Sequence, residues 1–149
     1  RQWSRGLGDV YKRQVDSTAA VADLAAQIGL SINACWRRVK RLQDETIDRQ
    51  VAILQPEQFG FGLTAFVSVR TNEHNDQWLQ TFAEGISKID EVVEFYRLSG
   101  QYDYLLKILA KDVADYDLVY KRIIKIAPLT DVSSSFAMER IKTTTALPI

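Results

Sequence analysis

The chain has 149 residues, 46% hydrophobic and 26% charged, which is typical of a globular protein with one domain or two small ones. One cysteine and one histidine exclude an internal disulfide and a His/Cys metal cluster, and no apolar run approaches the ~20 residues of a membrane span. The net charge of zero hides an asymmetry, since residues 1–50 hold 9 Lys and Arg against 6 Asp and Glu. A basic front joined to an acidic back suits a DNA-contacting part and a part that stays off DNA.

Residues 1–15 predict no helix, because their apolar residues lack helical spacing and Gly6 and Gly8 would each cost a helix roughly 1 kcal/mol. We expect a disordered or irregular leader that is foreign to the rest of the chain. An unusual native N-terminus is the alternative.

A short helix is predicted over residues 20–28, with N-cap candidates at 16–18. Its apolar stripe consists of Val21, Leu24, Ala25 and Ile28. Gly29 and Leu30 then turn the chain into Ser31, the predicted N-cap of a second helix that runs to about Asp44.

The second helix combines a predicted buried stripe with a basic surface. The stripe contains Ile32, Cys35, Trp36, Val39 and Leu42, and the other faces carry Asn33, Arg37, Arg38, Lys40 and Arg41. Two short helices, a glycine turn and a basic second helix describe a helix-turn-helix, whose second helix enters the DNA major groove. The pattern alone also fits an ordinary helical hairpin with a solvated basic face.

Beyond the helices, residues 47–54 are predicted to form a linker strand, with a domain boundary near residues 55–62, where Pro56, Gly60 and Gly62 interrupt the chain. Residues 63–149 alternate between periods of two and 3.6 residues. They predict strands at 63–70, 92–98, 102–109 and 132–141, and helices at 76–89 and 112–127. The order βαββαβ is that of a ferredoxin-like domain, so the fold class is α+β.

Two blocks of sequence resemble one family. The segment ADLAAQIGLSINACWRRVKRLQDE at residues 22–45 is similar to the helix-turn-helix of the Lrp/AsnC (leucine-responsive, feast/famine) transcriptional regulators. The match continues through LSGQYDYL at 98–105 and SSFAME at 134–139. It covers about residues 16–149.

The resemblance implies a winged-helix-like helix-turn-helix domain at 16–48 with its first helix apparently missing, a linker strand and hinge at 49–62, and a ligand-sensing RAM domain with an ACT-like fold at 63–149. It implies a cytoplasmic, DNA-binding transcriptional regulator, and no enzyme or cofactor. Its partners would be double-stranded DNA, an amino acid or related metabolite, and copies of the same chain in a homodimer that assembles further to a tetramer or octamer. The expected DNA-binding residues are Ser31, Asn33, Ala34, Arg37, Arg38 and Arg41.

The turn at residues 99–104 has two compatible interpretations. Read from the residues, it is a hairpin turn in which Gly100 supplies a positive φ and Asp103 accepts hydrogen bonds from loop amides. The resemblance adds an effector pocket, in which Asp103 would pair with a ligand ammonium. The expected effector-binding residues are Ser99, Gly100, Tyr102, Asp103 and Ser134.

Other residues predict no separate site. Cys35 is expected to be a small buried thiol, Trp36 a core residue and His74 a solvated loop residue. The rival hypothesis is a stand-alone metabolite-binding or small catalytic ferredoxin-like domain whose front segment only packs. A chromatin-organising protein with little sequence preference is a third possibility.

Overall fold

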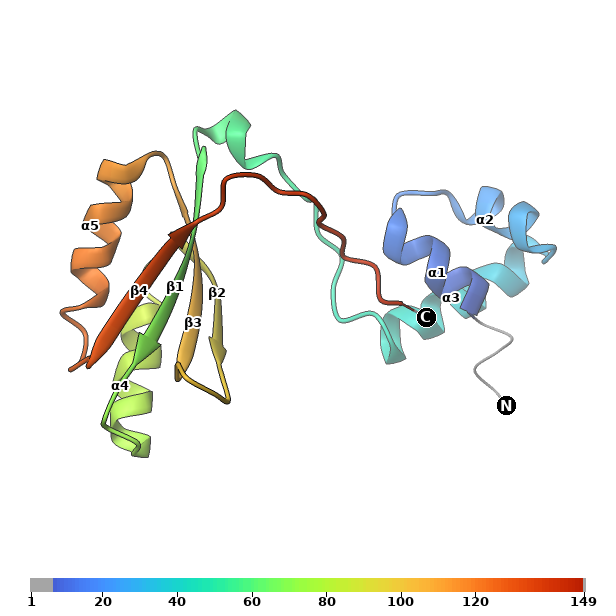
Figure 1. The fold of residues 1–149 in the computed structure, drawn as a ribbon. Coiled ribbons are helices and arrows are strands. Elements are labelled where there is room, and N and C mark those ends of the chain that lie inside the picture. Colours follow the sequence, from blue (N-terminus) through green and yellow to red (C-terminus); the bar gives the residue numbers. More distant parts are fainter. Residues whose placement is uncertain (1–6, 149) are drawn as a thin grey trace. The chain divides into compact units, whose positions relative to one another are not determined.

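The computed structural model describes residues 7–148 (Figure 1). The chain divides into two compact units, one of residues up to 53 together with those from 141 onward, the other of residues 54–140. Each unit has its own hydrophobic core.

The first unit contains three helices, α1 (Leu7–Val15), α2 (Val21–Ile28) and α3 (Ile32–Glu45). Gly29 closes α2 in the left-handed region at φ 68°, and its N–H donates to the carbonyl of Ala25. Because glycine has no Cβ, this tight exit costs little, and it sets the turn of a helix-turn-helix. The core between α2 and α3 consists of Leu24, Ala25, Cys35 and Val39.

Two expectations for the start of this unit are wrong. Residues Leu7–Val15 form a helix despite Gly8, and Lys12 and Arg13 in its last turn suit the negative end of the helix dipole. Residues 1–6 lie outside the described part, and the foreign origin of the leader stays a prediction. Asp16 does not cap α2 either. It accepts hydrogen bonds from the N–H and hydroxyl of Thr18, while Ala20 occupies the N-cap without a side-chain bond.

The end of the chain belongs with the first unit, whereas we expected the second domain to extend to residue 149. The side-chain amide of Gln14 in α1 donates to the carbonyl of Leu147 at 3.0 Å and accepts from its N–H at 2.9 Å. This paired contact ties the C-terminal segment to α1.

The linker is not a strand in this structure. Residues 46–55 belong to no helix or strand, and a short 3₁₀ helix, η2 (Pro56–Phe59), follows. A strand needs a neighbour for its backbone N–H and C=O groups, and none of the described residues pairs with this segment.

The second unit confirms the βαββαβ order. Its elements are β1 (Leu63–Arg70), α4 (Asp76–Ile86), β2 (Val92–Arg97), β3 (Tyr104–Ala110), α5 (Val113–Ile123) and β4 (Asp131–Phe136). The sheet order is β2-β3-β1-β4, and all three neighbouring pairs are antiparallel. Strand β4 ends at Phe136, five residues earlier than predicted.

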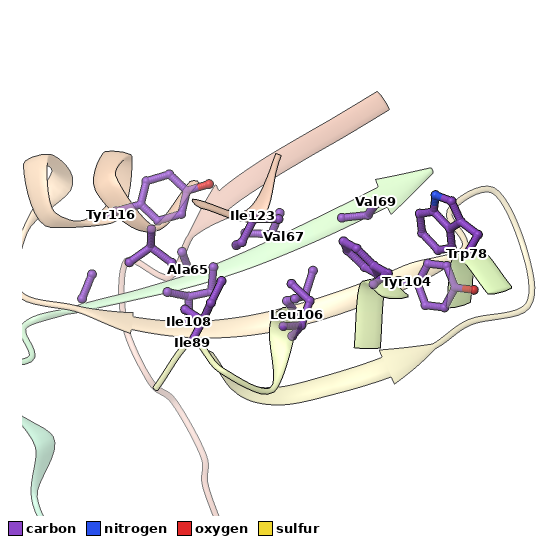
Figure 2. Close-up of a cluster of buried hydrophobic side chains, with 14 residues drawn as sticks. Ala65, Val67, Val69, Trp78, Ile89, Tyr104, Leu106, Ile108, Tyr116 and Ile123 are labelled. Atoms are coloured by element: carbon purple, nitrogen blue, oxygen red, sulfur yellow. The ribbon is translucent and has the colours of Figure 1, made fainter. Parts of the chain in front are cut away.

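One face of this sheet carries the core. Alternate residues of β1 and β3 are fully buried, and they pack with side chains from both α4 and α5 (Figure 2). At one end of the core, Trp78 stacks on Phe82 with 4.8 Å between ring centroids. No helix of the second unit covers the opposite face, which exposes Phe66 and Tyr96 around a Glu94–Lys107 ion pair of 2.7 Å.

Candidate DNA interface and effector turn

Helix α3 is the basic element that the sequence predicts. Its N-cap is Ser31, whose hydroxyl accepts from the N–H of Ala34 at 3.3 Å. This bond satisfies one of the free N–H groups of the first helical turn. The exposed side then carries Asn33, Arg37 and Lys40. These three residues recur at intervals of four and three, so they share one face.

The other predicted DNA-binding residues are placed less favourably. Ala34 and Arg38 are half-buried, because they flank the stripe formed by Cys35 and Val39. Arg41 is exposed, but its Nε lies 3.9 Å from a carboxylate oxygen of Glu45, so this cation already has an anionic neighbour on the same helix. Asn33 and Arg37 are exposed and form no ion pair with any described residue. The same holds for Lys40, which was not among the predicted contacts.

The prediction that Trp36 is a core residue is wrong. Its side chain is 53% exposed, and the ammonium of Lys40 lies 5.4 Å from its ring centroid. Residue 36 is turned about 100° from Cys35 around the helix, and the fully buried Cys35 occupies the core position. Ile32, also expected in the buried stripe, is 59% exposed at the first position of the helix.

The turn between β2 and β3 is held by Asp103. Its Oδ2 accepts from the N–H of Thr71 at 2.9 Å, and its backbone N–H donates to the carbonyl of Val69. Its Oδ1 lies 4.0 Å from Nδ1 of His74. One carboxylate oxygen therefore fixes the turn to the end of β1, and the other faces a histidine.

Neighbouring residues complete the turn. Gly100 has φ 135°, which confirms the predicted positive φ. The Arg70 guanidinium lies over the ring of Tyr102, 5.2 Å from its centroid, and its Nε donates to the carbonyl of Gln101 at 2.9 Å. Ser99 and Gly100 are exposed at the tip.

Beside Asp103 the surface is hollowed, with a volume of about 100 Å³. Four polar lining residues, His74, Asn75, Asp76 and Arg97, were not predicted as site residues. Arg97 belongs to the same β2–β3 hairpin as Asp103, whereas His74, Asn75 and Asp76 are distant in sequence and are brought to the turn by the pairing of β1 with β3. The hollow is lined by His74, Asn75, Asp76, Leu79, Arg97, Leu98, Asp103 and Tyr104.

Ser134 does not join the turn within this chain. It lies on β4 opposite Val67, and its hydroxyl makes a short hydrogen bond with the hydroxyl of Tyr116 on α5. Burial raises the pKa of the Tyr116 phenol above its ordinary value. The assignment of Ser134 to the effector site stays a prediction.

Two features are absent from residues 7–148. No three His, Cys, Asp or Glu side chains come together as metal ligands, and no helix is long and apolar enough to cross a membrane.

Each of the two units matches a known domain family. Residues 14–43 match the AsnC-type helix-turn-helix domain, and residues 64–147 match the Lrp/AsnC ligand binding domain. The chain is 45% identical over 138 residues to the DNA-binding transcriptional activator DecR of Escherichia coli K12, with 91% of each chain covered. It is 44% identical over 137 residues to the glutamate uptake regulatory protein of Zymomonas mobilis, covering 91% of this chain and 84% of that protein.

Solved structures of transcriptional regulators are also similar to this chain. An AsnC family transcriptional regulator from Agrobacterium tumefaciens superposes with a TM-score of 0.91 at 49% identity, covering 97% of this chain and 95% of the other. A transcriptional regulator from Neisseria meningitidis in complex with L-Met also gives 0.91, at 29% identity, covering 97% and 94%.

A capped basic helix in a helix-turn-helix, joined to a ferredoxin-like sensor domain, defines a DNA-binding transcriptional regulator. The chain belongs to the Lrp/AsnC family.

Proposed function

We propose that this regulator reads its operator with the exposed face of α3. The observation that carries the proposal is the exposure of Asn33, Arg37 and Lys40 on one face of a helix whose other face is packed. Asn and Arg side chains form bidentate hydrogen bonds with adenine and guanine edges, and Lys pairs with phosphate. The hydroxyl of Ser31 accepts from Ala34 and keeps its own proton to donate to a phosphate.

The effector in this proposal is an amino acid bound beside Asp103. Support comes from the relative that was solved with L-Met and from the hollow next to the turn. Because Oδ2 of Asp103 already accepts from Thr71, a ligand ammonium would pair with Oδ1, on the side of His74. The ligand carboxylate would bind Arg97 or the free N–H groups of the turn.

The proposed assembly is a homodimer that associates further into a tetramer or octamer. The helix-free face of the sheet exposes Phe66 and Tyr96, and a stable interface needs roughly 800 Å² from each partner. We place the protein in the cytoplasm, where a regulator reaches the DNA, and assign it no catalytic activity.

Salt dependence of DNA binding tests the proposal against the rival of a stand-alone metabolite-binding domain. A duplex is enriched from a random pool with the full chain, and its Kd is measured by fluorescence anisotropy at several salt concentrations. Wild type should show a steep negative slope of log K against log salt, because phosphate contacts release counterions.

Arg37→Ala should weaken this binding. It should either flatten the slope by roughly 1, if Arg37 contacts phosphate, or relax the preference for one base pair, if it reads guanine. The matched control is Lys125→Ala, which removes an exposed cation from the second unit and should change neither quantity. Unchanged binding by Arg37→Ala removes this residue from the interface, and no duplex binding by wild type supports the rival.

A further inference from the structure

Helix α3 exposes two large apolar side chains on a surface that otherwise suits DNA. Ile32 is 59% exposed and Trp36 is 53% exposed, and both lie in the first half of the helix. They are four residues apart, so they are neighbours on the helix surface. Asn33 directly follows Ile32 in the sequence, and Arg37 directly follows Trp36.

Within residues 7–148, this apolar surface is not part of the hydrophobic core. The core of the first unit is formed by Leu24, Ala25, Cys35 and Val39, and the residues that pack against it are Val21, Ile28 and Leu30. Exposed apolar side chains that stand together, with polar neighbours, are typical of a contact surface. The surrounding cations indicate that the surface it meets is anionic.

The indole ring of Trp36 contacts a cation and is not part of the core. The ammonium of Lys40 lies 5.4 Å from the ring centroid of Trp36, one helical turn further along α3. Such a cation–π contact restrains the ring against the helix. The contact favours this orientation of the ring, and the ammonium beside it remains able to pair with a phosphate.

We propose that Trp36 contacts the C5-methyl group of a thymine in the major groove and so determines base preference at that position. The inference rests on the proposed function, in which α3 enters the groove. The thymine methyl is the apolar group that a base pair presents there, and apolar side chains distinguish thymine by it. Ile32 extends the apolar contact, and Lys40 positions the ring.

Replacing thymine by deoxyuridine tests the proposal, because it removes the methyl group and leaves every hydrogen-bonding group of the base in place. Each thymine of the enriched duplex is replaced in turn, and Kd is measured for wild type and for Trp36→Ala. Wild type should bind about fourfold more weakly when one particular thymine is replaced, the value of a single buried methyl-sized group. Trp36→Ala should bind the two duplexes equally, with an unchanged salt slope.

Three controls keep the result specific. Tyr11→Ala removes an aromatic side chain of α1 that is 55% exposed, and it should retain the full thymine preference. Trp36→Leu keeps an apolar side chain and should retain part of the preference, which preserves the test if Trp36→Ala binds too weakly to measure. Thermal unfolding midpoints of the variants should stay within a few degrees of wild type, because the replaced side chains are exposed.

The proposal is overturned if wild type shows no preference for thymine over deoxyuridine at any position, or if Trp36→Ala keeps the wild-type preference. Absence of any duplex binding by wild type is a different result, since it refutes the proposed DNA-binding function itself.

Discussion

Asp103 in the proposed effector turn has a structural role that limits which of its carboxylate oxygens can bind a ligand. The carboxylate of Asp103 already fixes the turn through the N–H of Thr71, at 2.9 Å. Its remaining oxygen faces His74 at 4.0 Å and is the one that a ligand can use. Asp103→Asn keeps an acceptor for Thr71 and removes the charge, so this substitution separates the structural role from the binding role.

Gly100 should not tolerate a side chain, for reasons of backbone conformation alone. Its φ is 135°, and a Cβ built there meets no atom within 4 Å. Gly100→Ala should therefore lower the free energy of unfolding by roughly 1–3 kcal/mol through backbone strain. Chemical denaturation measures this. Gly62→Ala is the matched control, since Gly62 lacks a positive φ and its Cβ would meet only ordinary contact with Lys111 at 3.6 Å. Equal stability of the two variants would contradict the strain argument.

The sequence located α3 correctly but not every side chain on it. The N-cap at Ser31 and the core positions of Cys35 and Val39 followed from residue type and helical spacing. Trp36 was misassigned because its hydrophobicity was given more weight than its angle around the helix. His74 was missed because its proximity to Asp103 comes from strand pairing, which no local pattern contains.

Among the elements, strands β2 and β3 carry a pH-dependent contact on the helix-free face. Lys107 donates to Glu94 at 2.7 Å, and this hydrogen bond is the main cause of a lowered pKa of Glu94. A carboxyl whose pKa is lower in the folded state stabilises the fold above its unfolded pKa, near 4.5, and loses that contribution as the pH falls through the folded pKa.

Glu94→Gln should therefore lower the unfolding midpoint at pH 7 and have a smaller effect at about pH 3. The contribution is at most about 1 kcal/mol, because both side chains are around one third exposed and solvent screens the pair. Thermal unfolding at the two pH values measures it. Glu139→Gln, which changes an exposed glutamate with no ion pair to any described residue, should show no such difference. An effect of Glu94→Gln that grows in acid would contradict the assignment.

Element type was predictable wherever periodicity was strong, and the exceptions have physical reasons. All four strands and both helices of the second unit followed from their periods of two and 3.6 residues. Helix α1 was missed because Gly6 and Gly8 were given too much weight, although Leu7, Val10, Tyr11 and Val15 do recur at helical spacing. The predicted linker strand is absent, although its residues favour β structure, because they have no neighbouring strand among the described residues to pair with.

In the whole molecule, the proposed DNA-reading helix belongs to one unit and the proposed amino-acid site to the other. By linkage, an effector that changes affinity for DNA must have its own affinity changed by DNA to the same extent. A bound amino acid should also raise the stability of the folded chain, so a thermal-shift screen of the twenty amino acids identifies the effector to use.

The measurement that tests this most directly is the Kd of the enriched duplex with and without that amino acid, for wild type and Asp103→Asn. We predict a change of at least about fivefold for wild type, in either direction. The change should be largely lost in Asp103→Asn, because losing a desolvated charge pair weakens ligand binding by roughly 2–5 kcal/mol. A wild-type Kd that none of the twenty amino acids alters, or an undiminished response in Asp103→Asn, would contradict the account.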